Sequence, residues 1–174
     1  MKAPLLLLTV MAVLAVSPAG AAAVSGHALD LASANVDGHR ILGRTIAGVT
    51  AALGRSDYHA GKRLSYKLGW GARPNFSIEV MFRPVAGVER AWSMAFEHGV
   101  HDVKLGDLLG RSSPALQGAI LKSYGDSFKL VRPYKCKAKI CVGEFAQRTG
   151  SLHIGFGTQP TLDTWLTVWQ APTD

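Results

Sequence analysis

The tetrapeptide Leu42-Gly43-Arg44-Thr45 recurs later in the chain as Leu109-Gly110-Arg111-Ser112. Each copy precedes a short helical pattern that ends on a glycine. Thr45 is the expected N-cap of the first helix, and Ser113 with Pro114 is expected to begin the second. The apolar stripes of the two helices are Ile46, Val49 and Leu53, ended by Gly54, and Leu116, Ile120 and Tyr124, ended by Gly125. Such internal similarity predicts two related units.

A basic, polar stretch and then strand-like alternation follow each helical pattern. Ile78, Val80 and Phe82 alternate with polar or less apolar residues in the first half, as Leu152, Ile154 and Phe156 do in the second. A period of two with one apolar face is typical of an antiparallel sheet covered on one side. Each half then closes on an aromatic strand, at residues 92–97 and 165–170. The sequence therefore predicts an α+β fold of two tandem helix-plus-antiparallel-sheet repeats, with the helices packed on one face of the sheet or sheets.

The chain begins with the three parts of a secretory signal peptide. Lys2 precedes an apolar run from Leu5 to Val16, and small residues fill the region up to Ala23. The apolar run is shorter than the roughly 20 residues that a membrane-spanning helix needs. We expect residues 1–23 to be removed, which leaves a secreted or periplasmic chain without a transmembrane segment. The expected organisation is an N-terminal segment (24–37), repeat 1 (38–97), a connector (98–104), repeat 2 (105–170) and a tail (171–174).

The run from Leu42 to Gly54, followed by antiparallel strands, resembles the unit shared by the β-lactamase inhibitor protein and the SmpA/OmlA outer-membrane-assembly lipoproteins. In the inhibitor family, two such units lie in tandem and their sheets join into a curved surface that grips a target protein. The resemblance implies this architecture for residues 38–170. The lipoproteins carry an anchoring cysteine after their leader, which this chain lacks, and the inhibitor has two disulfides. No inhibitory residue is carried over.

The two cysteines, Cys136 and Cys141, are separated by four residues. In an oxidising compartment an isolated pair at this spacing favours a local disulfide that pins a hairpin or bulge. A metal site would need further ligands nearby, and a redox pair is usually spaced Cys-x-x-Cys. The sequence predicts a structural disulfide, no cofactor and no metal.

Basic residues concentrate in two stretches, each placed after a predicted helix, in a chain of net charge +7. One interpretation is a solvated face, since charge favours solubility before it favours partners. The other is a contact surface for an acidic protein, an anionic envelope polymer or lipid headgroups, because the two clusters could form one electropositive band. Nucleic acid is disfavoured in an exported chain without a nucleic-acid module. The candidate contact residues are Lys62, Arg63, Lys67, Arg73, Arg132, Lys135, Lys137 and Lys139.

Trp165 and Trp169 form a second candidate binding site on the last strand. If Leu166 and Val168 face the core, both indoles stand on the open sheet, where aromatic side chains make good binding anchors. Alignment of Trp92 with Trp165 predicts the reverse, because Trp92, Met94 and Phe96 oppose small residues. The period-two pattern of large aromatic residues favours burial.

No catalytic motif is present: there is no Gly-x-Ser-x-Gly, His-Glu-x-x-His or phosphate-binding glycine loop. His98 and His101, three apart among carboxylates, are the one cluster that suggests a metal or catalytic centre. The sequence favours a secreted non-enzymatic binding protein. The most specific version of this hypothesis is an inhibitor of an extracellular enzyme. The alternatives are an exported hydrolase whose site assembles from separated residues, and an envelope-associated structural protein held by charge.

Overall fold

A sheet of eight strands is the framework of the computed structural model, which describes residues 27–56, 58–62, 65–70, 78–96, 100–159 and 162–171. The strand order is β10-β11-β12-β13-β7-β6-β5-β4, and each neighbouring pair is antiparallel. Two four-stranded meanders are thus joined through β13 and β7. The strands are β4 (Tyr58–Lys62), β5 (Ser65–Trp70), β6 (Ile78–Val85), β7 (Val88–Phe96), β10 (Phe128–Lys137), β11 (Ile140–Gln147), β12 (Leu152–Gln159) and β13 (Leu162–Gln170).

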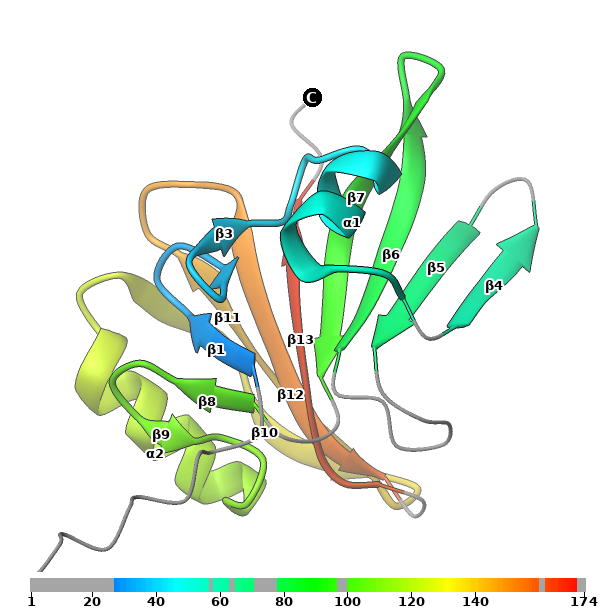
Figure 1. Cartoon of the computed structure of the whole chain (residues 1–174). Helices are drawn as coiled ribbons and strands as arrows, with labels where there is room; N and C mark the ends of the chain where they lie inside the picture. Colours follow the sequence, from blue (N-terminus) through cyan, green and yellow to red (C-terminus); the bar gives the residue numbers. More distant parts are fainter. Residues whose placement is uncertain are drawn as a thin grey trace, which may run out of the picture.

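A smaller sheet and two helices lie on one side of this large sheet (Figure 1). The small sheet has the order β3-β2-β1-β8-β9, and its central pair, β1 and β8, is parallel. That pair joins segments from the expected N-terminal segment and the expected connector. The elements are β1 (His27–Asp30), β2 (Asn35–Val36), β3 (His39–Arg40), β8 (Val100–Asp102), β9 (Gly106–Asp107), α1 (Ile46–Leu53) and α2 (Ser113–Tyr124).

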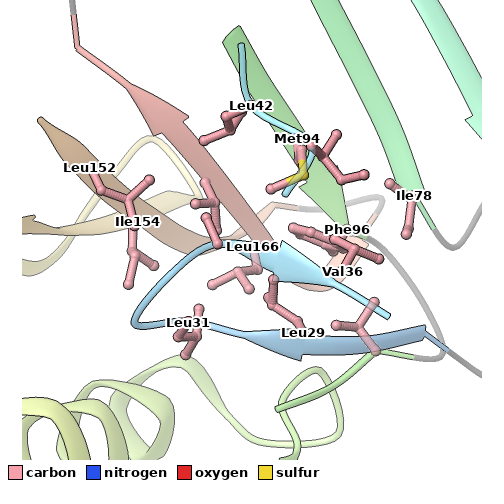
Figure 2. Close-up of a cluster of buried hydrophobic side chains, with 14 of the residues drawn as sticks. Leu29, Leu31, Val36, Leu42, Ile78, Met94, Phe96, Leu152, Ile154 and Leu166 are labelled. Atoms are coloured by element: carbon pink, nitrogen blue, oxygen red, sulfur yellow. The ribbon is translucent and has the colours of Figure 1, made fainter. Parts of the chain in front are cut away.

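The hydrophobic core fills the space between the large sheet and this covering layer. Ile78, Val80 and Phe82 of β6 have no exposed surface, and Ile154 and Phe156 of β12 are equally buried, as their alternation predicts. Figure 2 shows the small-sheet residues Leu29 and Val36 close to Phe96 and Leu166 of the large sheet. The helices contribute the predicted stripes: Val49, Leu116, Ile120 and Tyr124 are buried, and Ile46 and Leu53 pack against the cluster.

Local capping signals place the helix ends. The Thr45 hydroxyl accepts a hydrogen bond from the Gly48 amide at 3.2 Å, and Gly54 ends α1 with a φ of 82°. In α2 the N-cap is Ser112, one residue before the expected Ser113, and Pro114 lies in the first turn. The capping residues in the sequence therefore locate both helices to within one residue, although only Thr45 of α1 forms the side-chain cap hydrogen bond in the structure.

The predicted α+β fold of two tandem helix-plus-sheet repeats is wrong, because the protein is mostly β. The described residues contain thirteen strands, while the two helices have only 8 and 12 residues. The basic stretches after the helices, expected around the first strand of each repeat, include the two edge strands of the large sheet, β4 and β10. Edge strands favour charged residues because their outer side is solvated, and this composition hides the alternation that identifies a strand. Residues outside the predicted repeats supply β1, β2 and β8 of the second sheet.

A buried carboxylate ties the covering layer together. Asp102, at the end of β8, is 3% exposed and accepts hydrogen bonds from the amides of Leu31, Lys104 and Leu105 at 3.2, 2.9 and 2.8 Å. The Tyr124 hydroxyl of α2 donates to the same carboxylate at 2.8 Å. Asp102 thus links β8 with the chain after β1 and with the last turn of α2.

We expect the stability of the fold to decrease above pH 10 through Tyr124. Burial, together with the hydrogen bond to Asp102, raises the pKa of the Tyr124 hydroxyl well above its usual value of about 10. The folded state therefore retains a proton that the unfolded state loses, so this contribution is complete below pH 10 and decreases as the pH rises beyond it. Urea unfolding at a series of alkaline pH values should show a steeper loss of stability for the wild type than for Tyr124→Phe. Parallel curves would contradict the prediction.

Candidate functional site

The last strand places two tryptophans on the face of the large sheet that the helices do not cover. Leu166 and Val168 of β13 have no exposed surface and belong to the core. Trp165 and Trp169 alternate with them, so both indoles lie on the opposite, open face, where they are partly exposed. The period-two pattern favoured burial of both indoles in the core, and this prediction is wrong.

A β-bulge brings Trp92 to the same face. Met81 pairs with Ser93, whereas the next residue, Phe82, pairs with Ala91, so Trp92 is the extra residue of β7. The inserted residue changes the alternation: Met94 and Phe96 remain in the core, but Trp92 leaves it. The prediction that Trp92 shares a face with Met94 and Phe96 is therefore wrong, because side chains alternate regularly only in a strand without a bulge.

Glycines in β12 make room for the indoles. A Cβ atom on Gly155 would lie 2.9 Å from Cζ3 of Trp169 and 3.6 Å from Cζ3 of Trp165, so both rings reach over this one residue. A Cβ atom on Gly157 would approach Trp165 and collide with the Cys141 carbonyl oxygen. Gly155 and Gly157 alternate with core residues along β12. Glycines that alternate with core residues in a strand indicate that large side chains of a neighbouring strand lie over the open face at those positions.

These side chains enclose a hollow of about 370 Å³ on the open face. We call it the tryptophan hollow; it is lined by Met81, Trp92, Ser93, Arg132, Val142, Gly143, Glu144, Gly155, Trp165, Thr167 and Trp169. They come from six adjacent strands, β6, β7, β13, β12, β11 and β10. The volume lies within the range of small-molecule sites, about 300–1,000 Å³.

Charged groups border the hollow on two sides. Glu144 lies 2.9 Å from Nδ1 of His153 and 3.7 Å from Nη2 of Arg132. The His153 ring stacks on Trp169 with a centroid separation of 5.3 Å. At the other side, Cζ of Arg83 lies 5.6 Å from the centre of the Trp92 ring, in cation–π geometry. The described lining of the hollow therefore combines indole surface with a carboxylate and the Arg132 guanidinium group, and the Arg83 guanidinium group lies against Trp92 outside that lining.

Ser93 supplies a hydroxyl without a partner. Its side chain projects from the open face of β7, lines the hollow and is only 1% exposed. The Oγ atom forms no hydrogen bond. An unsatisfied buried hydroxyl is costly, and native structures rarely retain one.

The structure does not bring the predicted basic residues into one band. Arg132, Lys135 and Lys137 lie on β10, at one edge of the large sheet, and Lys139 lies in the turn that follows. Lys62 and Lys67 lie on β4 and β5, and six strands separate β4 from β10. Arg63 and Arg73 fall outside the described residues. Of the predicted basic set, the described side chains contribute only Arg132 to the tryptophan hollow.

The predicted disulfide is confirmed. Cys136 and Cys141 are directly paired across the β10–β11 hairpin, with their Cα atoms 3.9 Å apart, and their sulfurs are bonded. The bond closes the hairpin next to the strand segment that carries Lys135 and Lys137.

The one described histidine candidate, His101, does not line the hollow. His101 is on β8 of the small sheet, opposite Asp107 of β9, and His98 is outside the described residues, as is the predicted signal peptide. Within the described ranges, no group of three or more His, Cys, Asp or Glu residues could hold a metal ion. Neither described helix has the length and apolar character that a membrane crossing requires.

The sequence identified Trp165, Trp169 and Arg132 as candidates but did not identify Trp92, Ser93, Glu144 or Met81. These four residues converge only through strand pairing and the bulge in β7. Comparison of the chain with protein-family models, curated proteins and solved structures found no match.

Proposed function

We propose that this chain is a non-enzymatic binding protein that acts outside the cytoplasm and uses the tryptophan hollow as its contact surface. The observation that carries the proposal is the presence of three partly exposed tryptophans on the open face of the large sheet. Tryptophan and arginine are the residues most enriched where binding energy concentrates.

The extracellular location is part of this proposal. The Cys136–Cys141 disulfide supports it, because such bonds persist in oxidising compartments. The leader-like residues 1–23 support it from the sequence. If the bound partner is an extracellular enzyme, the function would be inhibition of that enzyme.

The test is removal of the two indoles that meet over Gly155. We expect Trp165→Ala/Trp169→Ala to weaken capture of ligands from culture fluid and envelope fractions at least about thirty-fold, since one binding hot spot contributes 2 kcal/mol or more. Quantitative affinity capture on immobilised wild-type and variant protein measures this. Thermal unfolding checks that the variant is folded.

Leu121→Ala is the matched control. Leu121 is 41% exposed and lies on α2, on the other side of the large sheet. Its removal deletes exposed apolar surface of a similar kind without touching the hollow, so capture should be unchanged. Equal capture by wild type, control and double variant would contradict the proposal.

A further inference from the structure

We propose that the tryptophan hollow binds an acidic sugar, with a pyranose ring stacked on Trp165 and Trp169 and the carboxylate of the sugar at Arg132. The inference rests on the proposed function and names the ligand class of the same site. The natural ligand would then be a polysaccharide that contains uronate residues.

The first observation is an aromatic stacking surface in the hollow. The six-membered rings of Trp165 and Trp169 meet over Gly155, where each has an atom within 4 Å of the same point. The two indoles therefore lie close enough together over this residue for one ligand to contact both. A pyranose presents a face of C–H groups, which packs favourably on the electron-rich face of an indole.

The second observation is the unpartnered hydroxyl in the hollow. Ser93 Oγ is buried, lines the hollow and has no hydrogen-bond partner. An apolar side chain from a protein partner would leave it unsatisfied, as it is in the unbound protein. A sugar brings hydroxyl groups beside its apolar face, so one ligand can cover the indoles and also satisfy Ser93.

The third observation is the positive charge of Arg132 in the hollow. Arg132 lines the hollow, and its side chain is 63% exposed. Its Nη2 atom is 3.7 Å from Glu144, beyond hydrogen-bond distance, so the guanidinium group is oriented but its donors remain available to a ligand. Guanidinium groups bind carboxylates through two parallel hydrogen bonds. Glu144, the one carboxylate among the described lining residues, lies within hydrogen-bond distance of His153.

Charge complementarity extends from the hollow along the sheet edge. Beyond Arg132, β10 carries exposed Lys135 and Lys137, and Lys139 follows in the turn. At the opposite side, Arg83 lies at Trp92. A polyanion whose sugar occupies the hollow would therefore meet cations in both directions, and the net charge of +7 favours its approach.

The experiment titrates the full chain with three probes: oligogalacturonate, a neutral galacto-oligosaccharide and a sulfated galactan that contains no uronate. Tryptophan fluorescence and calorimetry report binding. We expect saturable binding of oligogalacturonate that weakens with added salt, and binding of the neutral sugar that is weaker and insensitive to salt. Tighter binding of the sulfated galactan than of oligogalacturonate would overturn the carboxylate assignment in favour of a sulfated sugar.

Three variants assign the roles. Trp165→Ala/Trp169→Ala should weaken both sugars at least about thirty-fold. Arg132→Gln should weaken oligogalacturonate about tenfold and leave the neutral sugar unchanged, since it removes a charged hydrogen-bond donor. Ser93→Ala should weaken both sugars while leaving the unfolding midpoint unchanged or higher, because the unbound protein loses an unsatisfied hydroxyl. Lys122→Gln, which removes an exposed cation on α2, is the matched charge control and should change nothing.

Two further outcomes would overturn the inference. If Lys135→Gln/Lys137→Gln/Lys139→Gln abolishes binding while the tryptophan double variant binds normally, the sheet edge and not the hollow is the contact. If no sugar binds but the tryptophan-dependent capture described above persists, the ligand is of another class and the proposed function stands. Loss of both would remove the proposed function as well.

Discussion

Replacing Asp102 with alanine should lower the free energy of unfolding by about 3–5 kcal/mol. The substitution removes the acceptor for the amides of Leu31, Lys104 and Leu105 and for the Tyr124 hydroxyl. Leu31 and Tyr124 are buried, so their donors cannot find water instead, and each buried orphan costs about 1–3 kcal/mol. The loss is a large part of the 5–15 kcal/mol that usually stabilises a domain.

Urea unfolding followed by circular dichroism measures the effect, with Asp107→Ala as the matched control. Asp107 lies on neighbouring β9 and accepts hydrogen bonds from the Leu109 and Gly110 amides, both at 3.1 Å. It is exposed, so water can replace it, and the control should lose about 1 kcal/mol or less. Similar losses for the two variants would show that Asp102 does not hold the covering layer together.

The second large effect is expected from a charge in the core of the large sheet. Val80 of β6 and Ile154 of β12 have no exposed surface, and each lies between two neighbouring strands. Val80→Asp or Ile154→Asp would place a carboxylate without a partner among apolar side chains. We expect each to cost more than about 4 kcal/mol and to leave the chain largely unfolded at room temperature.

Met81→Asp tests whether the effect depends on the face of the sheet. Met81 follows Val80 directly, but it lies on the open face and is partly exposed. Its carboxylate would be solvated, and the expected loss is about 1 kcal/mol. Thermal unfolding of both variants provides the comparison; an equal loss at positions 80 and 81 would contradict the assignment of faces in β6.

Local pattern in the sequence was sufficient for the features that depend on neighbouring residues. Thr45 and Gly54 delimit α1, and the alternation at Ile154 and Phe156 identifies the buried face of β12. The spacing of Cys136 and Cys141 predicted a disulfide that closes a hairpin. Each follows from the geometry of one turn, one strand or one short loop, which the sequence encodes directly.

Only the tertiary structure decided the fold class and the composition of the tryptophan hollow. The basic stretch around Lys135 does not show the alternation of a strand, because β10 is solvated at the sheet edge. The parallel pairing of β1 with β8 joins segments far apart in the chain, and no local pattern encodes such a partner. Trp92 joins Trp165 and Trp169 because one bulge shifts β7 by a residue, and a one-residue shift moves a side chain to the other face of a sheet.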